Sequence, residues 1–371
     1  MTDAGIYIHI PFCASKCKYC TFVSSPQNAD VQNQYFKALW QEIDACPHKR
    51  RIATIFFGGG TPSIVNPALL CQTLEKIKAK FDVAQDAEIT LEANPNAIDL
   101  KKLKMLRAAG FNRISFGVQS FEDVVLQKLG RTHTAAQGFC AIKMAKHAGF
   151  DNINIDLILG ASSLNRKCFS ASVHRAKTLG VSHISVYMLQ LENATPLFQE
   201  VQSQKTSVLG DEEVVDDYHF AQKTLENCGF MQYEISNFAL RGRQCRHNLN
   251  YWQMGEYLAF GISAHAFVEN KRIANIATLE KYLQNPLAQE NFDMQNVSKS
   301  QWVEEFIMLS LRLEKGLDLK KLKNLSVDLI KEKKEIIENL IKNNIILIKN
   351  NFLKINPQHF CISNAIICEL I

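Results

Sequence analysis

The sequence predicts an α/β fold: a partial (β/α)6 barrel of the TIM type, followed by an α+β region and a small winged-helix-like appendage. Six short runs of β-branched and aromatic residues alternate with helix-like stretches, and this alternation predicts parallel βα units. The runs are almost continuously apolar, which is typical of strands buried on both faces. A complete eight-unit barrel needs two more units, and no clear unit follows residue 189.

Hydrophobic period and glycine positions locate the elements of the barrel. Gly110, Gly149 and Gly180 each follow a helix-like stretch, where a left-handed cap favours glycine. Strands are predicted at 6–10, 53–57, 88–92, 113–117, 152–159 and 183–189. Helices are predicted at 35–45, 67–80, 100–109, 135–147 and 168–179.

The pattern changes at about residue 211. We expect a helix at 212–228, a strand at 233–238 and then a polar loop with Arg241, Arg243, Cys245, Arg246 and His247. From residue 298 a Lys-, Asn- and Ile-rich section predicts helices and a hairpin whose turn is Asn350–Asn351. The predicted division is therefore a barrel at 1–210, a linking region at 211–297 and a small C-terminal domain at 298–371.

The composition is that of a globular protein. The 371 residues are 47% hydrophobic with a net charge of +5, which is too mild to indicate nucleic acid by itself. The Lys residues of the tail alternate with Ile and Leu at helical spacing and predict a solvated face. The sequence has no apolar run of 18 residues and no secretory leader, so we expect a cytoplasmic location without a transmembrane segment.

Three cysteines form the most informative motif, Cys13-x3-Cys17-x2-Cys20. The motif follows the first strand, and in a βα barrel that position is the mouth at the carboxyl ends of the strands. Three thiolates can hold a [4Fe-4S] cluster with one open iron, which the amino and carboxylate groups of S-adenosylmethionine (SAM) can chelate. The alternative is a zinc site, which needs a fourth ligand, such as Cys245 or His247.

Further polar residues follow later strands. Gly58, Gly59, Gly60 and Thr61 follow the second strand, where a glycine run offers free N–H groups and lets backbone approach a ligand. A tight turn alone is the alternative. Other polar residues are expected at the same mouth, where carboxylates suit a ribose or an ammonium group and an arginine suits a carboxylate: Glu92, Gln119, Arg131 and Asp156.

The segment from Tyr7 to Cys13, with Lys16, Cys17, Tyr19 and Cys20, resembles the radical SAM signature of the coproporphyrinogen oxidase-like group. That group holds oxygen-independent coproporphyrinogen III oxidases and HemW-type heme chaperones, and the resemblance covers nearly the whole chain. It implies that Cys13, Cys17 and Cys20 hold the cluster. It also implies SAM contacts at Tyr7, Tyr19, Gly59, Gly60, Thr61, Glu92, Gln119, Arg131 and Asp156.

One position separates the two members of the group. The oxidases carry a further cysteine two residues after the third one, where this chain has Phe22. The segment Cys245-x-His247-Asn-x-x-Tyr251-Trp252 resembles the heme chaperones. Histidine and cysteine are common heme ligands, and aromatic rings offer flat faces to a macrocycle. A heme role for His247 and a purely structural role both remain open.

The resemblance therefore implies a heme chaperone that binds a cluster, SAM and heme, and passes heme to an apoprotein. A reductant protein for the cluster, transient membrane association and a monomer or dimer are further expectations, with no nucleic-acid partner. The alternative is an enzyme of porphyrin biosynthesis that decarboxylates coproporphyrinogen III. One segment departs from the family: Gly160-Ala-Ser-Ser-Leu164 replaces Gly-Leu-Pro-Gly-Gln, so altered SAM affinity is expected.

Overall fold

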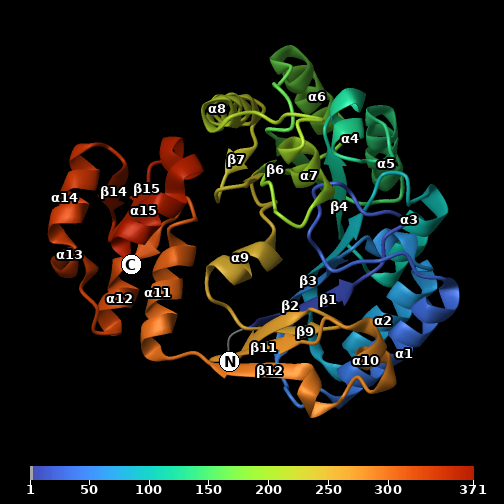
Figure 1. Ribbon diagram of the computed structural model, residues 1–371. Coiled ribbons are helices and arrows are strands. Elements are labelled where there is room, and N and C mark those ends of the chain that lie inside the picture. Colours follow the sequence, from blue (N-terminus) through green and yellow to red (C-terminus); the bar gives the residue numbers. More distant parts are fainter. Residues whose placement is uncertain (1–2) are drawn as a thin grey trace.

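The computed structural model describes residues 3–371, and one large curved sheet organises most of them (Figure 1). Its strand order is β12-β11-β10-β9-β1-β2-β3-β4-β5-β6-β8-β7. The central six strands are parallel and confirm the six predicted ones. Their bounds are β1 (Ala4–Ile10), β2 (Arg51–Gly59), β3 (Asp82–Ala93), β4 (Arg113–Gln119), β5 (Asn152–Leu159) and β6 (His183–Met188).

Helices cover the outer face of these strands (Figure 1). The five predicted helices are present, and α1 begins at Ala29 instead of residue 35 because the Asn28 side chain accepts the Val31 N–H at 3.0 Å. Two short helices, α4 and α7, were not predicted. The helices are α1 (Ala29–Ala45), α2 (Pro67–Lys80), α3 (Leu100–Ala109), α4 (Asp123–Lys128), α5 (Ala135–His147), α6 (Arg166–Thr178) and α7 (Pro196–Gln202).

The barrel does not close. On one side β9 (Tyr257–Phe260) pairs parallel with β1, and β10 (His265–Val268), β11 (Lys271–Asn275) and β12 (Phe292–Asn296) continue the sheet antiparallel. On the other side β8 (Asn237–Ala239) pairs antiparallel with β6. The sheet therefore runs without a break into strands contributed by residues 211–297.

Two predictions for the middle of the chain are wrong. Residues 233–238 do not form one strand: β7 (Met231–Gln232) and β8 run antiparallel, and the backbone reverses between them. The Tyr218 hydroxyl stabilises this turn by donating to the Ile235 carbonyl at 2.6 Å. The expected polar loop likewise ends in a helix, α9 (Arg246–Trp252), which Cys245 precedes as N-cap.

The C-terminal section contains the predicted helices and hairpin around its own apolar core, which includes Phe306, Leu322, Leu340 and Leu353. Asn350 and Asn351 both have positive φ, 53° and 63°, as a tight hairpin turn requires. Its elements are α11 (Lys299–Ser310), β13 (Leu317–Asp318), α12 (Leu319–Asn324), α13 (Leu329–Glu332), α14 (Lys334–Lys342), β14 (Ile346–Lys349), β15 (Phe352–Ile355) and α15 (Ser363–Leu370), with strand order β13-β15-β14.

The remaining helices are α8 (Asp211–Asn227), near the predicted 212–228, and α10 (Leu279–Gln284). None of the helices formed by residues 3–371 is both long and apolar enough to span a bilayer. The three-part domain division stays a prediction.

Candidate functional site

The cysteine loop leaves β1 at the mouth of the barrel and is tied down along its length. The Cys13 N–H donates to the Ser25 carbonyl at 3.3 Å, and the Lys18 N–H donates to the Leu129 carbonyl at 3.2 Å. The Lys18 carbonyl in turn accepts the Leu197 N–H at 2.9 Å. One contact within the loop and two contacts with distant segments, at Leu129 and Leu197, therefore hold the loop in place. Cys13, Cys17 and Cys20 are free, partly exposed thiols.

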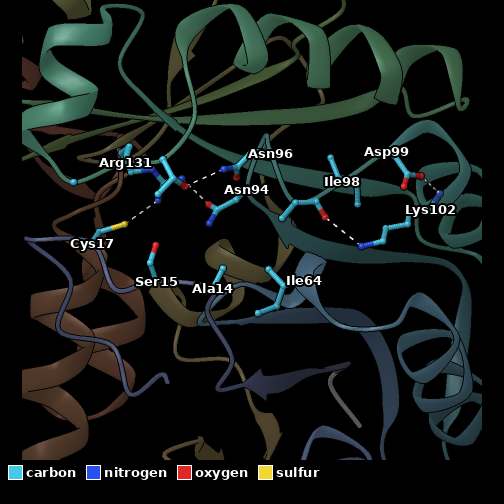
Figure 2. A pocket seen from close by; sticks show the side chains of 13 residues that line it. Ala14, Ser15, Cys17, Ile64, Asn94, Asn96, Ile98, Asp99, Lys102 and Arg131 are labelled. Carbon is cyan, nitrogen blue, oxygen red and sulfur yellow. Dashed lines mark hydrogen bonds between the residues drawn. The ribbon is translucent and has the colours of Figure 1, made fainter. Parts of the chain in front are cut away.

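Two of the three thiols already have hydrogen-bonding neighbours at the mouth. Cys13 Sγ lies 3.2 Å from Thr61 Oγ1. An Arg131 N–H donates to Cys17 Sγ at 3.3 Å (Figure 2). Hydrogen bonds and positive charge stabilise thiolates, the form in which cysteine binds metal.

Arg131 is the central side chain of this cluster. Its Nη2 donates to the Asn94 side-chain oxygen at 2.6 Å and to the Gly117 carbonyl at 2.7 Å. Its Nε is buried and has no hydrogen-bond partner among the described residues. A cavity of about 410 Å³ opens beside it and is lined by Cys17, Asn94, Lys102 and Arg131 among others (Figure 2). Arg131 therefore gives the wall of this cavity a positive charge, which suits an anionic group.

These residues fit the cofactors that the sequence implies. Among residues 3–371, no three His, Cys, Asp or Glu side chains converge as a single metal ion would require. The donor set at the mouth is instead three thiols spread along one loop, and thiolates suit an iron–sulfur cluster. The unpaired Arg131 Nε suits the carboxylate of a bound ligand.

The glycine segment at the end of β2 differs from the expectation. The Gly59 N–H donates to the Glu92 carboxylate at 3.2 Å, the Gly60 N–H to the Ile10 carbonyl at 2.9 Å and the Thr61 N–H to the Phe12 carbonyl at 2.7 Å. The prediction of free N–H groups is therefore wrong at these positions. Gly59 has a φ of 114°, and a Cβ there would lie 2.7 Å from the His9 ring. A tight turn against the end of β1 accounts for the glycine.

Two carboxylates face the lumen, Glu92 from β3 and Asp156 from β5, the two strands that flank β4. Burial and then the charge of Asp156 raise the pKa of Glu92 to about 8. Burial also raises the pKa of Asp156, whose oxygens accept hydrogen bonds from Ser115 at 3.3 Å and Asn154 at 2.8 Å. Desolvation of two like charges favours the protonated form. A ligand that donates hydrogen bonds or carries positive charge would stabilise the ionised form of these carboxyls.

The structure brings the remaining predicted residues to the same end of the lumen. Tyr7 Oη lies 3.1 Å from the His9 ring, and burial raises the pKa of Tyr7. Burial raises the pKa of Tyr19 too, against the opposing charge of Arg131. Gln119 is the last residue of β4 and has a φ of 65°. Its side-chain amide folds back over Gly117, where an added Cβ would be 2.9 Å from Gln119 Nε2.

Three further residues of the site were not predicted. Asn94 links Arg131 to Thr61, and Ser115 and Asn154 bind Asp156. A sequence signal did exist, because Asn154 and Ser115 alternate with apolar residues at the strand period and thus point into the lumen. Asn94 follows Glu92 by two positions at the end of β3.

The Cys-x-His motif lies at the opposite end of the lumen, which we call the floor. His247 is 1% exposed, and its two ring nitrogens lie 2.8 Å from the Thr54 hydroxyl and 2.7 Å from the Tyr251 hydroxyl. Burial, followed by the charge of Arg113, lowers the pKa of His247 to about 3. The structure thus supports the structural alternative for His247 over the heme-ligand prediction.

The neighbours of His247 are engaged in the same way. Glu88 accepts the backbone N–H groups of Arg246 and His247 at 3.2 and 3.1 Å, and the Cys245 thiol at 3.5 Å. It therefore satisfies the first turn of α9. The Tyr251 ring packs edge-on against His247 at 4.7 Å. Neither Cys245 nor His247 points to the cysteine loop as the fourth ligand of the zinc alternative.

A parallel barrel with a Cys-x3-Cys-x2-Cys loop and a polar set at its mouth defines a radical SAM protein. The family model described as the radical SAM superfamily matches residues 7–176. Heme chaperone HemW of Bacillus subtilis is 35% identical over 85% of each chain. Heme chaperone HemW of Haemophilus influenzae is 36% identical over 83% of this chain and 82% of the relative. The chain belongs to the HemW family of heme chaperones.

One solved structure supports the fold over the full length. Coproporphyrinogen III oxidase (HemN) from Escherichia coli superposes with a TM-score of 0.84 and 22% identity, covering 99% of this chain and 90% of that chain. At this identity the similarity establishes the fold alone.

Proposed function

We propose that this protein is a heme chaperone that binds a [4Fe-4S] cluster, SAM and heme, and passes heme to an apoprotein. The observation that carries the proposal is the identity to relatives named Heme chaperone HemW, 35% over 85% of this chain. The three free thiols and the unpaired Arg131 Nε at the mouth support the cluster and SAM parts of it.

Each side chain of the mouth has a role in this proposal. Cys13, Cys17 and Cys20 hold the cluster. Arg131 binds the SAM carboxylate, and Glu92 and Asp156 accept hydrogen bonds from its ammonium or ribose groups. The other SAM contacts are Tyr7, Tyr19, Gly59, Gly60, Thr61 and Gln119. When reduced, such a cluster can supply the electron that cleaves SAM, while the barrel positions the ligand and excludes water.

Phe22 favours the chaperone over the oxidase alternative. Phe22 is 63% exposed and occupies the position where the oxidases carry a further cysteine. The oxidase alternative rests on the shared fold.

We also propose a cytoplasmic location, a separate reductant protein for the cluster and a heme-accepting apoprotein as partners. Eleven free thiols suit a reducing compartment. Transient membrane contact belongs to the delivery step of this proposal, and the protein acts as a monomer or dimer.

The test is anaerobic reconstitution with iron and sulfide, followed by heme titration and incubation with coproporphyrinogen III and SAM. We expect a cluster, stoichiometric heme binding and no conversion of the porphyrinogen. Conversion to protoporphyrinogen would establish the oxidase alternative. A reconstituted protein that binds no heme would refute the chaperone proposal while leaving the cluster assignment intact.

A further inference from the structure

One hydrogen-bonded chain joins two of the three cluster cysteines at the mouth. We propose that Asn94, at its centre, is a positioning residue that aims the donors of Thr61 and Arg131 at the Cys13 and Cys17 sulfurs. The inference rests on the cluster of the proposed function and adds a residue that sets the properties of that cluster.

The hydrogen-bonded chain consists of four consecutive contacts. Cys13 Sγ lies 3.2 Å from Thr61 Oγ1, which accepts an N–H from the Asn94 amide at 3.1 Å. The Asn94 side-chain oxygen accepts from Arg131 at 2.6 Å, and Arg131 donates to Cys17 Sγ at 3.3 Å. Figure 2 shows Arg131 reaching from Asn94 to Cys17.

The direction of each hydrogen bond follows from the amide group. Arg131 can only donate, so the Asn94 oxygen is the acceptor and the Asn94 nitrogen faces Thr61. Because the Thr61 oxygen accepts from Asn94, its own hydrogen is free to point at Cys13. One amide therefore directs a donor to each of two thiolates, and an aspartate would instead draw the Thr61 hydrogen to itself.

Asn94 is fixed well enough to do this. It follows β3 directly, and its N–H donates to the Ser63 hydroxyl at 3.1 Å. Its carbonyl accepts the Ala97 N–H at 3.0 Å. The following Pro95 restricts the backbone of Asn94 further. Both backbone groups are thus engaged, and the side chain is held between Thr61 and Arg131.

Hydrogen bonds to cysteine sulfur stabilise the more negative, reduced state of an iron–sulfur cluster and so raise its potential. Loss of the Thr61 donor should therefore lower the potential. At a fixed applied potential, we expect Asn94→Asp to reduce the ratio of reduced to oxidised cluster about tenfold, which is about 59 mV for one electron.

The experiment is an anaerobic redox titration of the reconstituted full-length protein, followed by the paramagnetic signal of the reduced cluster. Asn96→Asp is the matched control, because it adds the same charge two residues away, where the side chain is exposed and binds Thr132 instead of this chain. We expect the control to shift the ratio less than threefold.

Thr61 provides a second, independent readout. Thr61→Ser keeps the hydroxyl and should keep the potential of the wild type, whereas Thr61→Val should shift it as Asn94→Asp does. If Asn94 acts through Thr61, the double variant shifts the potential by less than the sum of the single shifts.

Three outcomes would overturn the inference: equal shifts in Asn94→Asp and Asn96→Asp, an unchanged potential in Asn94→Asp, or fully additive shifts with Thr61→Val. Failure of the wild-type protein to assemble any cluster would instead refute the proposed function. If the Asn94 variant assembles no cluster, the two Thr61 variants still test the inference. Equal potentials in Thr61→Ser and Thr61→Val would show that the Thr61 hydroxyl does not affect the cluster.

Discussion

The mouth and the floor of the barrel both carry cysteine, arginine and acidic side chains, but they differ in how these groups are satisfied. At the mouth, the three cysteines are partly exposed and the Arg131 Nε has no hydrogen-bond partner within residues 3–371. At the floor, His247 is buried and both of its ring nitrogens have partners.

The difference shows how a binding site can be separated from a structural network of similar composition. A buried polar group without a partner costs free energy, so a fold keeps such a group where a ligand supplies the partner. A polar network that is complete within the protein stabilises the fold instead. By this criterion His247 belongs to a structural network and Arg131 to the candidate binding site. Arg113 is an exception at the floor, because its Nε and Nη1 are buried without partners among the described residues.

The largest expected effect tests the mouth. Cys17→Ser removes one of three thiolates and should abolish cluster assembly, because a [4Fe-4S] cluster is held by cysteine thiolates. The free energy of unfolding of the metal-free protein should change by less than about 1 kcal/mol, since the side chain is partly exposed. Iron analysis and denaturant titration measure the two quantities.

Cys140→Ser is the matched control for that variant, because Cys140 is an exposed cysteine on α5. It should assemble the cluster normally. Full iron content in Cys17→Ser would remove the distinction between mouth and floor.

The next effect tests the floor. His247→Ala should lower the free energy of unfolding by about 3 kcal/mol, because it leaves a cavity and removes the partners of Thr54 and Tyr251. Heme affinity and the heme spectrum should stay unchanged. Denaturant titration and heme titration of the same preparation measure both.

Tyr251→Phe serves as the graded control, since it deletes only one hydroxyl at the floor. It should cost about 1 kcal/mol. A His247→Ala variant that keeps its stability but loses heme would restore His247 as a heme ligand.

A matched pair of smaller effects compares one substitution at both ends. Glu92 has a pKa raised to about 8, so its stabilising contribution is present below about pH 4.5 and is lost as the pH rises through 8. Glu92→Gln should therefore stabilise the ligand-free protein by on the order of 1 to 2 kcal/mol above pH 8, and little at pH 5.

Glu88→Gln should act with the opposite sign. Glu88 accepts two backbone N–H groups of α9. The amide of a glutamine has one oxygen and can accept only part of these hydrogen bonds. We therefore expect the free energy of unfolding to fall by about 1 to 2 kcal/mol at neutral pH. Unfolding curves of both variants across the pH range test the pair. The same sign in both variants would contradict the comparison.

The smallest effect is expected at the rim of the mouth. Phe22 is 63% exposed, so Phe22→Ser should change the free energy of unfolding by less than about 0.5 kcal/mol and leave cluster assembly intact. A larger loss in the heme-bound protein than in the heme-free protein would instead assign Phe22 a contact with heme.

Local patterns in the sequence predicted the parallel strands, most helices and the cysteine loop. These depend on short-range signals: apolar runs, glycine after helices and the spacing of three cysteines, each of which is read within one segment. The hairpin at Asn350–Asn351 belongs to the same class, since its turn needs only residues that tolerate positive φ.

Which polar side chains already have hydrogen-bond partners could be learned only from the folded structure. In the sequence, His247 and Arg131 are both polar residues of a motif. In the structure, both ring nitrogens of His247 have partners, at residues 54 and 251. Arg131 contacts residues 17, 94 and 117. Such partners are set by how strands far apart in the chain pack around one lumen. The pairing of β9 with β1 and the turn between β7 and β8 could not be predicted from the sequence either. Sheet pairing depends on long-range contacts that no local pattern encodes.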